Sequence, residues 1–153
     1  MKILVVNGPN LNLLGIREPH IYGHQTLDDL EAAVAAHASK LGMRVRFFQS
    51  NHEGEIVDEL QRNRKWADAV IINPAAFTHY SYAIRDALLA IALPTAEVHL
   101  SDLDNRPEPF RKISVIRDIV AHRFTGAGIG GYIQALDALD ADRAARAGTD
   151  DSP

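Results

Sequence analysis

The sequence predicts a three-layer α/β domain built around a parallel sheet. Short apolar runs alternate with longer amphipathic stretches along the chain, and three of the runs are almost continuous in Val, Ile and Ala. Regular alternation of strands and helices is typical of a parallel sheet with right-handed crossovers. Continuous apolar runs are typical of strands that are buried on both faces. A length of 153 residues, of which 46% are hydrophobic, suffices for one such domain.

Five of the apolar runs are predicted to be strands: residues 3–7, 45–49, 69–73, 96–100 and 119–124. Five parallel strands favour the flavodoxin-like order 2-1-3-4-5. We assign residues 1–146 to this single domain and expect the polar end, residues 147–153, to be a disordered tail.

Four amphipathic stretches are predicted to be helices. The first begins at Thr26 and Asp29, which have the spacing of a capping box, and it ends before Gly42. The third is expected to begin at a Thr78 cap and to end before Pro94. Apolar side chains spaced for one buried face define the four helices in turn: Leu27, Leu30, Val34 and Leu41; Ile56, Val57 and Leu60; Ala83, Ala87, Leu88 and Ile91; Tyr132, Ile133, Leu136 and Leu139.

Composition narrows the classes of function. The net charge of -4 provides no broad basic surface, so nucleic acid is not an expected partner. No apolar run reaches the roughly 18 residues that would span a membrane. The chain has no cysteine, which excludes disulfides, thiol nucleophiles and cysteine-bound metal, and fits a cytoplasmic protein.

Polar residues collect where the predicted strands end. In open α/β sheets, ligands bind beyond the carboxyl ends of the strands. The residues there are 7–10, 49–52, 73–74, 97–101 and 126–128, and they are rich in Asn, Gln, His and Ser. A lone Asn at such a position is most often a cap or a turn residue, but the coincidence of several at one edge predicts a binding site.

Two features at this edge suggest acid–base chemistry. Glu97 and His99 are two apart on a strand, so their side chains share a face, and a carboxylate beside an imidazole stabilises the protonated form that a general acid needs. The segment 15–23 lacks any helix or strand period and has the length of a functional lid that bears Arg17 and Tyr22. The alternatives are a buried histidine satisfied by its neighbour and an ordinary surface loop.

The strand-end motifs carry a family resemblance. The segment 7–19, NGPNLNLLGIREP, followed by Tyr22 and Gly23, resembles the signature of the type II 3-dehydroquinate dehydratases. The similarity continues through QSNHEG at 49–54, NPAAFTH at 73–79, RDA at 85–87 and EVHLS at 97–101, and covers nearly the whole chain from Lys2 to Leu139.

The resemblance implies an activity and a set of catalytic residues. The family converts 3-dehydroquinate to 3-dehydroshikimate in the shikimate pathway, which leads to the aromatic amino acids, and sometimes in quinate breakdown. It acts without a metal or another cofactor. By resemblance, Tyr22 removes a proton from carbon 2 and Arg17 favours its phenolate form. Asn10 holds a water against the enolate oxygen, and His99, oriented by Glu97, protonates the departing hydroxyl.

The resemblance also implies how the substrate is bound. The backbone amides of Leu100 and Ser101, with the Ser101 hydroxyl, resemble the family's carboxylate cradle, and Asn73 and His79 resemble residues that bind the ring. The family commonly forms dodecamers built from trimers, in which the residue matching Asp86 approaches the neighbouring subunit's site.

The segment 101–111, SDLDNRPEPFR, departs from the commonest family pattern. Two prolines stiffen it, and a His and an Asn of the usual pattern are missing. We place the substrate-binding arginine at Arg111, after Phe110, and interpret Arg106 as a structural or rim residue.

Three rival functions can be weighed against the residues. A Schiff-base dehydratase would need a lysine at a strand's carboxyl end, where the chain has none. A metal-dependent hydrolase would need convergence of His52, His79, His99, Glu53 and Glu97, none of which are paired at the spacing of a helical metal site. A non-enzymatic receiver or flavin-binding module would need an acceptor Asp where Asn73 lies, or a phosphate loop without Pro9.

Overall fold

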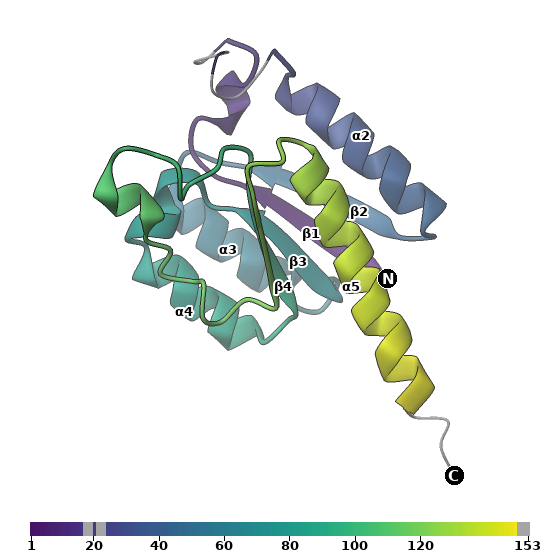
Figure 1. The fold of residues 1–153 in the computed structure, drawn as a ribbon. Helices are drawn as coiled ribbons and strands as arrows, with labels where there is room; N and C mark the ends of the chain where they lie inside the picture. Colours follow the sequence, from purple (N-terminus) through teal and green to yellow (C-terminus); the bar gives the residue numbers. More distant parts are fainter. Residues whose placement is uncertain (17–19, 21–23, 150–153) are drawn as a thin grey trace.

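The computed structural model describes residues 1–16, 20 and 24–149 (Figure 1). Its core is a sheet of five parallel strands: β1 (Lys2–Asn7), β2 (Arg44–Gln49), β3 (Ala69–Asn73), β4 (Thr95–His99) and β5 (His122–Thr125). The strand order is β2-β1-β3-β4-β5, which confirms the order predicted from the sequence. Arg17 and Tyr22, and residues 150–153 of the predicted tail, lie outside the described residues.

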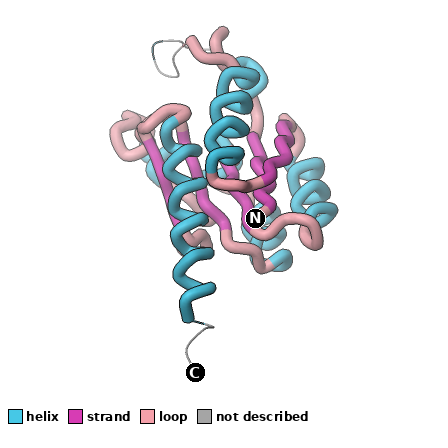
Figure 2. The backbone as a smooth tube through the Cα atoms, turned by 90° about the vertical axis from the view of Figure 1, so that its right-hand side faces the viewer, coloured by secondary structure: helices cyan, strands magenta, loops and turns pink. Residues whose placement is uncertain are grey.

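Within the described residues, four α-helices cover the two faces of the sheet. Helices α2 (Leu27–Lys40) and α5 (Gly130–Thr149) lie on one face, and α3 (Glu53–Asn63) and α4 (Tyr82–Ile91) lie on the other (Figures 1 and 2). Short 3₁₀ helices follow β1, β3 and β4: η1 (Leu11–Leu13), η2 (Ala75–His79) and η3 (Pro109–Lys112). The structure is therefore the predicted three-layer α/β sandwich.

The burial of the strands agrees with their composition. Every residue of β3 and β4 is buried, and so is β1 after Lys2, because these strands have neighbours on both sides and helices on both faces. The edge strands β2 and β5 remain partly exposed. Apolar side chains point alternately to the two faces, so that each face has its own core, one against α2 and α5 and one against α3 and α4.

Most of the helix signals were interpreted correctly. Thr26 and Asp29 form the predicted capping box, in which the Asp29 backbone N–H donates to Thr26 Oγ1 at 3.2 Å and the Thr26 N–H donates to Asp29 Oδ2 at 2.9 Å. Gly42 follows α2 with a φ of 65°, a left-handed conformation that suits glycine. None of the described helices has the length and apolar character needed to cross a bilayer.

The predicted start of α4 was wrong. Its cap is Ser81, whose Oγ accepts from the Ile84 backbone N–H at 3.0 Å, whereas Thr78 lies in η2 and turns its hydroxyl to a buried carboxylate. Ala87 and Leu88 of the predicted face are buried, but Ala83 is exposed and Ile84 is buried in its place.

Two further boundaries differ from the prediction. Strand β5 begins at His122, not at 119, because the preceding residues form turns that insert Ile116 into the core before the chain reaches the sheet. Helix α5 extends to Thr149, so residues 147–149 of the predicted tail are helical.

Candidate active site

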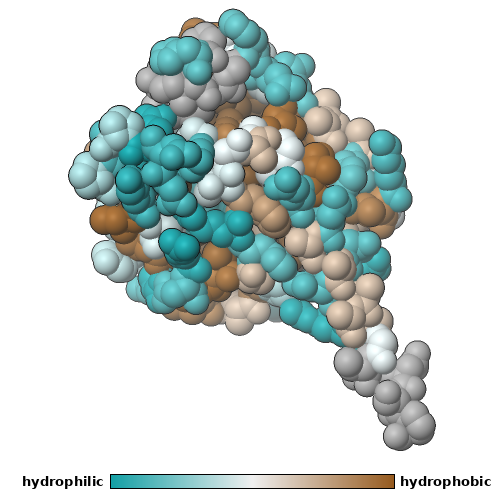
Figure 3. Space-filling view, viewed as in Figure 1, coloured by the Kyte–Doolittle hydropathy of each residue, from teal (hydrophilic) through white to brown (hydrophobic). Residues whose placement is uncertain are grey.

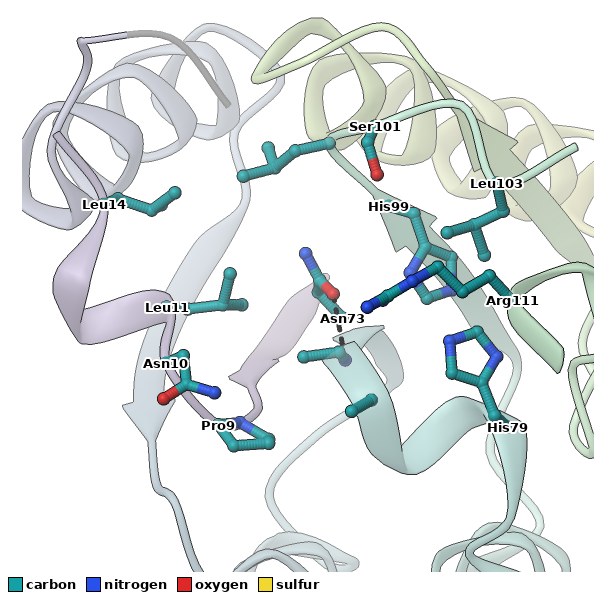
Figure 4. A pocket seen from close by; sticks show the side chains of 13 residues that line it. Pro9, Asn10, Leu11, Leu14, Asn73, His79, His99, Ser101, Leu103 and Arg111 are labelled. Carbon is teal, nitrogen blue, oxygen red and sulfur yellow. Dashed lines mark hydrogen bonds between the residues drawn. The ribbon is translucent and has the colours of Figure 1, made fainter. Parts of the chain in front are cut away.

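A pocket opens at the carboxyl edge of the sheet, beside η1, η2 and η3 (Figure 4). Most of the site residues predicted from the sequence line it: Asn10, Asn73, His79, His99, Leu100, Ser101 and Arg111. They come from three strand ends and the loops that follow, so the fold brings together segments that are far apart in the sequence. The remaining lining residues are Pro9, Leu11, Leu14, Ala75, Ala76 and Leu103.

Close packing of β1 and β3 shapes one wall of the pocket. The Gly8 backbone N–H donates to Asn73 O at 2.8 Å, and a Cβ on Gly8 would lie only 2.5 Å from Pro74 O. A glycine is therefore required where these strand ends meet. The next turn places Asn10 in a left-handed conformation with a φ of 67°, and its backbone N–H donates to Asn51 Oδ1 at 2.9 Å. The turn therefore fixes the position of Asn10 at the wall of the pocket.

The amide of Asn73 is oriented by the chain that follows it. Its Oδ1 accepts from the Ala75 backbone N–H at 3.1 Å, as drawn in Figure 4. Because the oxygen is engaged, the amide NH₂ is the group that can donate to a bound molecule. Asn73 therefore faces the pocket as a hydrogen-bond donor.

The polar residues that end β2 have a different role. The Gln49 amide NH₂ lies 3.2 Å from Gly8 O and 3.2 Å from Asn51 Oδ1, and neither Gln49 nor Asn51 lines the pocket. Ser50 Oγ accepts from the His52 N–H at 2.9 Å. At this strand the ordinary interpretation of polar residues, as loop and cap residues, is correct.

The Glu97–His99 pair is the most buried polar part of the site. His99 Nε2 lies 2.7 Å from Glu97 Oε1, and Glu97 is 0% exposed. The hydroxyls of Thr78 and Ser114 also donate to this carboxylate, with Ser114 Oγ 2.9 Å from each oxygen. Burial acts to raise the pKa of Glu97, but the hydrogen bonds from His99, Thr78 and Ser114 outweigh it and hold the pKa below its ordinary value. Glu97 is therefore an ionised carboxylate behind the pocket.

The contact with Glu97 determines which atom of His99 can react. A carboxylate only accepts, so Nε2 carries a proton and donates a hydrogen bond to Glu97. Since His99 lines the pocket, Nδ1 is left as the nitrogen that can exchange a proton with a bound molecule. Glu97 itself does not line the pocket and acts on it through His99.

His79 is positioned by a backbone carbonyl. Its Nδ1 lies 2.7 Å from Ile113 O, so Nδ1 carries the proton and Nε2 is free to accept a hydrogen bond. Burial, together with the nearby His99 and Arg111, lowers the pKa of His79 below its ordinary value. Neutral His79 is thus suited to bind a hydroxyl group.

The segment 101–111, which contains Pro107 and Pro109 and is called the proline-flanked loop below, places two arginines around the carboxylate of Glu108. Arg111 lines the pocket, with its Nε 3.1 Å from Glu108 Oε1. Arg106 lies behind it, with its Nε 3.8 Å from Glu108 Oε2, and does not line the pocket. In Figure 3 hydrophilic residues gather over the part of the molecule that bears η3. Arg111 is therefore the arginine of this loop that faces the pocket.

Some predicted residues lie elsewhere, and some contributors were missed. Asp86 is exposed on α4 and does not line the pocket.

The partners of Glu97 were not recognised from the sequence: Thr78 was interpreted as a helix cap, and Ser114 and Arg123 lie in stretches without a motif. Arg123 could have been found from the strand order, because it is the register partner of Glu97 across β4 and β5.

The described residues do not assemble the sites that two rival functions need. They contain no group of three or more His, Cys, Asp or Glu side chains placed to hold a metal ion. Glu53, one of the ligands that a metal site would use, accepts from the Ser81 hydroxyl at 2.5 Å instead. No lysine is among the described side chains that line the pocket.

Comparisons with known proteins agree on one family. Residues 1–140 match the family model described as dehydroquinase class II. The chain is 53% identical over 149 residues to the 3-dehydroquinate dehydratase of Pelotomaculum thermopropionicum, covering 97% of this chain and 100% of that protein. It is 53% identical over 136 residues to catabolic 3-dehydroquinase 1 of Aspergillus fumigatus, covering 89% and 90%. The crystal structure of type II dehydroquinase from Butyrivibrio crossotus superposes with a TM-score of 0.89 at 46% identity, covering 92% and 97%.

Proposed function

The chain belongs to the class II dehydroquinase family and is thus an enzyme that dehydrates 3-dehydroquinate, and we propose that Tyr22 and His99 carry out the two proton transfers of this reaction. The main support is the contact between His99, which lines the pocket, and the fully buried Glu97 carboxylate 2.7 Å from its Nε2. An imidazole held in this way is oriented to donate a proton to a bound molecule.

The first step is removal of the proton from carbon 2, beside the ketone, by the Tyr22 phenolate. A free tyrosine has a pKa of about 10 and is rarely ionised at pH 7, so a nearby guanidinium is needed, and Arg17 supplies it. The electron pair of the broken C–H bond forms a double bond between carbon 2 and the carbonyl carbon, and the carbonyl π electrons move to the oxygen, which gives an enolate. A water held by Asn10 donates a hydrogen bond to this oxygen, where the negative charge develops.

The second step is loss of the hydroxyl from carbon 1. The enolate electrons return to form the double bond between carbons 1 and 2, the C–O bond breaks, and the departing oxygen takes the Nδ1 proton of His99 to leave as water. Glu97 remains ionised and keeps the His99 imidazole in place. The scheme uses neither a metal nor an imine.

The other lining residues hold the substrate. The Asn73 amide donates to a ring hydroxyl, and His79 Nε2 accepts from one. Arg111, the backbone amides of Leu100 and Ser101 and the Ser101 hydroxyl bind the carboxylate. Donors and acceptors that are fixed before binding give the site its preference for a polyhydroxy ring acid.

The experiment that tests the scheme is an absorbance assay of 3-dehydroshikimate formation. Tyr22→Phe and His99→Asn should each lower kcat by at least about a hundredfold, the usual contribution of a general base or acid. Tyr80→Phe and His122→Asn are matched controls, because Tyr80 is exposed and His122 pairs with Asp142, and both should keep wild-type turnover. Full activity in Tyr22→Phe would remove the proposed base.

A second assay separates the two arginines of the proline-flanked loop. Arg111→Ala should raise KM by about tenfold or more, because a charge-assisted contact to the substrate carboxylate is lost. Arg106→Ala should leave KM close to the wild-type value, since Arg106 does not line the pocket. The reverse pattern would mean that Arg106 is the substrate-binding residue.

We also propose that the chain assembles into dodecamers built from trimers and works in the cytoplasm. Asp86 is exposed on α4, on the same helix as the exposed Tyr82 and Leu89, which supports a subunit contact on this side. The absence of cysteine supports a reducing compartment. Sedimentation velocity tests the assembly, and Asp86→Ala should lower activity only in the assembled enzyme.

A further inference from the structure

We propose that Arg123 on β5 is a positioning residue for the dehydration: it shares the Glu97 carboxylate with His99 and so keeps the His99 proton available for transfer. The proposal rests on the proposed role of His99 as the general acid. It assigns a function to a residue that lies outside the pocket and belongs to none of the strand-end motifs.

The sheet itself places Arg123 beside Glu97. The two residues are register partners on neighbouring strands, so their side chains leave the sheet on the same face. Arg123 Nε lies 3.4 Å from Glu97 Oε2, and only 14% of the Arg123 side chain is exposed. His99 approaches the other oxygen, Oε1, at 2.7 Å. The carboxylate therefore has a cation on one side and the catalytic imidazole on the other.

The contact between Arg123 and Glu97 is electrostatic more than directional. Among the described residues, Arg123 Nε and Nη2 are buried and have no partner with hydrogen-bond geometry. Hydrogen bonds to the carboxylate come instead from Thr78, Ser114 and His99. A guanidinium that contributes mainly its charge, close to a buried carboxylate, offsets part of the negative charge that neighbouring groups experience.

The expected effect on His99 follows from the charges around it. The negative charge of Glu97 beside Nε2 stabilises protonated His99, and without another cation this fully buried carboxylate would make the Nδ1 proton harder to release. Arg123 offsets part of this attraction from behind the carboxylate. On the pocket side the facing groups are His79 on η2 and Arg111 on η3. An acid that releases its proton more readily transfers it faster to the departing hydroxyl.

The test is the pH dependence of kcat for Arg123→Met and Arg123→Lys. The proposed general acid must be protonated, so we expect activity to fall at high pH, and Arg123→Met should move this alkaline limb to higher pH by about one unit, the size of shift that a nearby charge produces. It should also lower the plateau of kcat and leave KM unchanged. Arg123→Lys keeps the charge and should keep the limb near its wild-type position.

Two comparisons distinguish this role from a structural one. Arg143→Met, which removes a surface arginine paired with Asp140, should change neither kcat nor the limb. In a Glu97→Gln background, Arg123→Met should have little further effect on the limb, because the shared carboxylate is gone. If Arg123→Met proves unfolded, Arg123→Gln gives the same measurement, since it removes the charge and retains an amide donor.

The outcomes separate this proposal from the proposed function. A loss of kcat in Arg123→Met without movement of the limb, or an equal shift in Arg123→Lys, would overturn the role of Arg123 while leaving His99 as the acid. An active His99→Asn enzyme would instead overturn the acid assignment, and the proposal for Arg123 with it.

Discussion

The two faces of the sheet each bury a polar centre beneath the pocket, and the two centres differ in charge. On the face covered by α3 and α4, the Glu97 carboxylate contacts His99, Arg123 and two hydroxyls. On the face covered by α2 and α5, the Tyr132 hydroxyl donates to Asn7 Oδ1 at 2.7 Å, and both residues are 0% exposed. One centre is built from charges, and the other from neutral groups.

This difference indicates different roles. A buried charge is costly to desolvate and is a poor source of stability even when it is paired. A buried hydrogen bond between neutral groups costs much less, and the Asn7–Tyr132 contact joins β1 to α5 across 125 residues of sequence. The charged centre acts on the pocket through the imidazole of His99, whereas the neutral centre joins two elements and contacts the pocket only through the neutral amide of Asn73. We therefore expect the first to control catalysis and the second to control stability.

The largest expected effect is that of Glu97→Gln on catalysis. The substitution keeps the shape of the side chain but removes the charge that stabilises protonated His99. We expect kcat to fall by about a hundredfold or more and KM to change little. Steady-state kinetics measure both values. A variant with normal kcat would mean that His99 needs no carboxylate, and the assignment of chemistry to this face would fail.

The corresponding change on the other face is Tyr132→Phe. It leaves Asn7 Oδ1 buried without its donor, so the free energy of unfolding should fall by about 1–3 kcal/mol, measured by urea denaturation. Turnover should stay within about twofold of wild type. The exposed Tyr80 supplies the control, since Tyr80→Phe should change neither quantity. A large loss of kcat with unchanged stability would show that the neutral centre also serves catalysis.

The two centres also differ in how far they could be predicted from the sequence. Glu97 and His99 were found because a strand places residues two apart on the same face, and this relation depends only on local geometry. Asn7 was noted as a strand-end residue, and Tyr132 was interpreted as an apolar helix residue. Their contact depends on how α5 packs against β1, which no local pattern encodes.

The same distinction explains the errors in the fold. The buried strands follow from continuous apolar runs, the capping box of α2 from the spacing of Thr26 and Asp29, and the strand order from the common order of five parallel strands, and all three were predicted correctly. Thr78 was assigned to a helix cap because Thr commonly has that role, but the buried carboxylate of Glu97 competes for its hydroxyl and Ser81 caps α4 instead. Tertiary contacts decided between two local signals of similar strength.

A smaller effect is expected for the hydroxyls around Glu97. Ser114→Ala removes one donor and leaves the contacts from His99 and Thr78, so kcat should fall by about three- to tenfold, in keeping with a net value near 1 kcal/mol for one hydrogen bond. Ser81→Ala is the matched control. It removes the cap of α4 and should lower stability by about 1 kcal/mol without changing kcat. Equal kinetic losses in both variants would indicate a general structural effect.

The smallest expected differences are in the slopes of the free energy of unfolding against pH. The charged centre should lose its contribution at acid pH, and the neutral centre should lose its contribution at alkaline pH. The folded state lowers the pKa of Glu97, so its contribution is present above the ordinary glutamate range of about 4.3 and is lost as the pH falls through the lowered value. Burial raises the pKa of Tyr132 above its ordinary value of 10.0, so its contribution is present below pH 10 and is lost above it. Urea denaturation across the pH range should therefore give a shallower acid slope in Glu97→Gln and a shallower alkaline slope in Tyr132→Phe. If either variant changed the slope at the opposite end, the two centres would be coupled through the sheet and would not be the independent units that their separate faces imply.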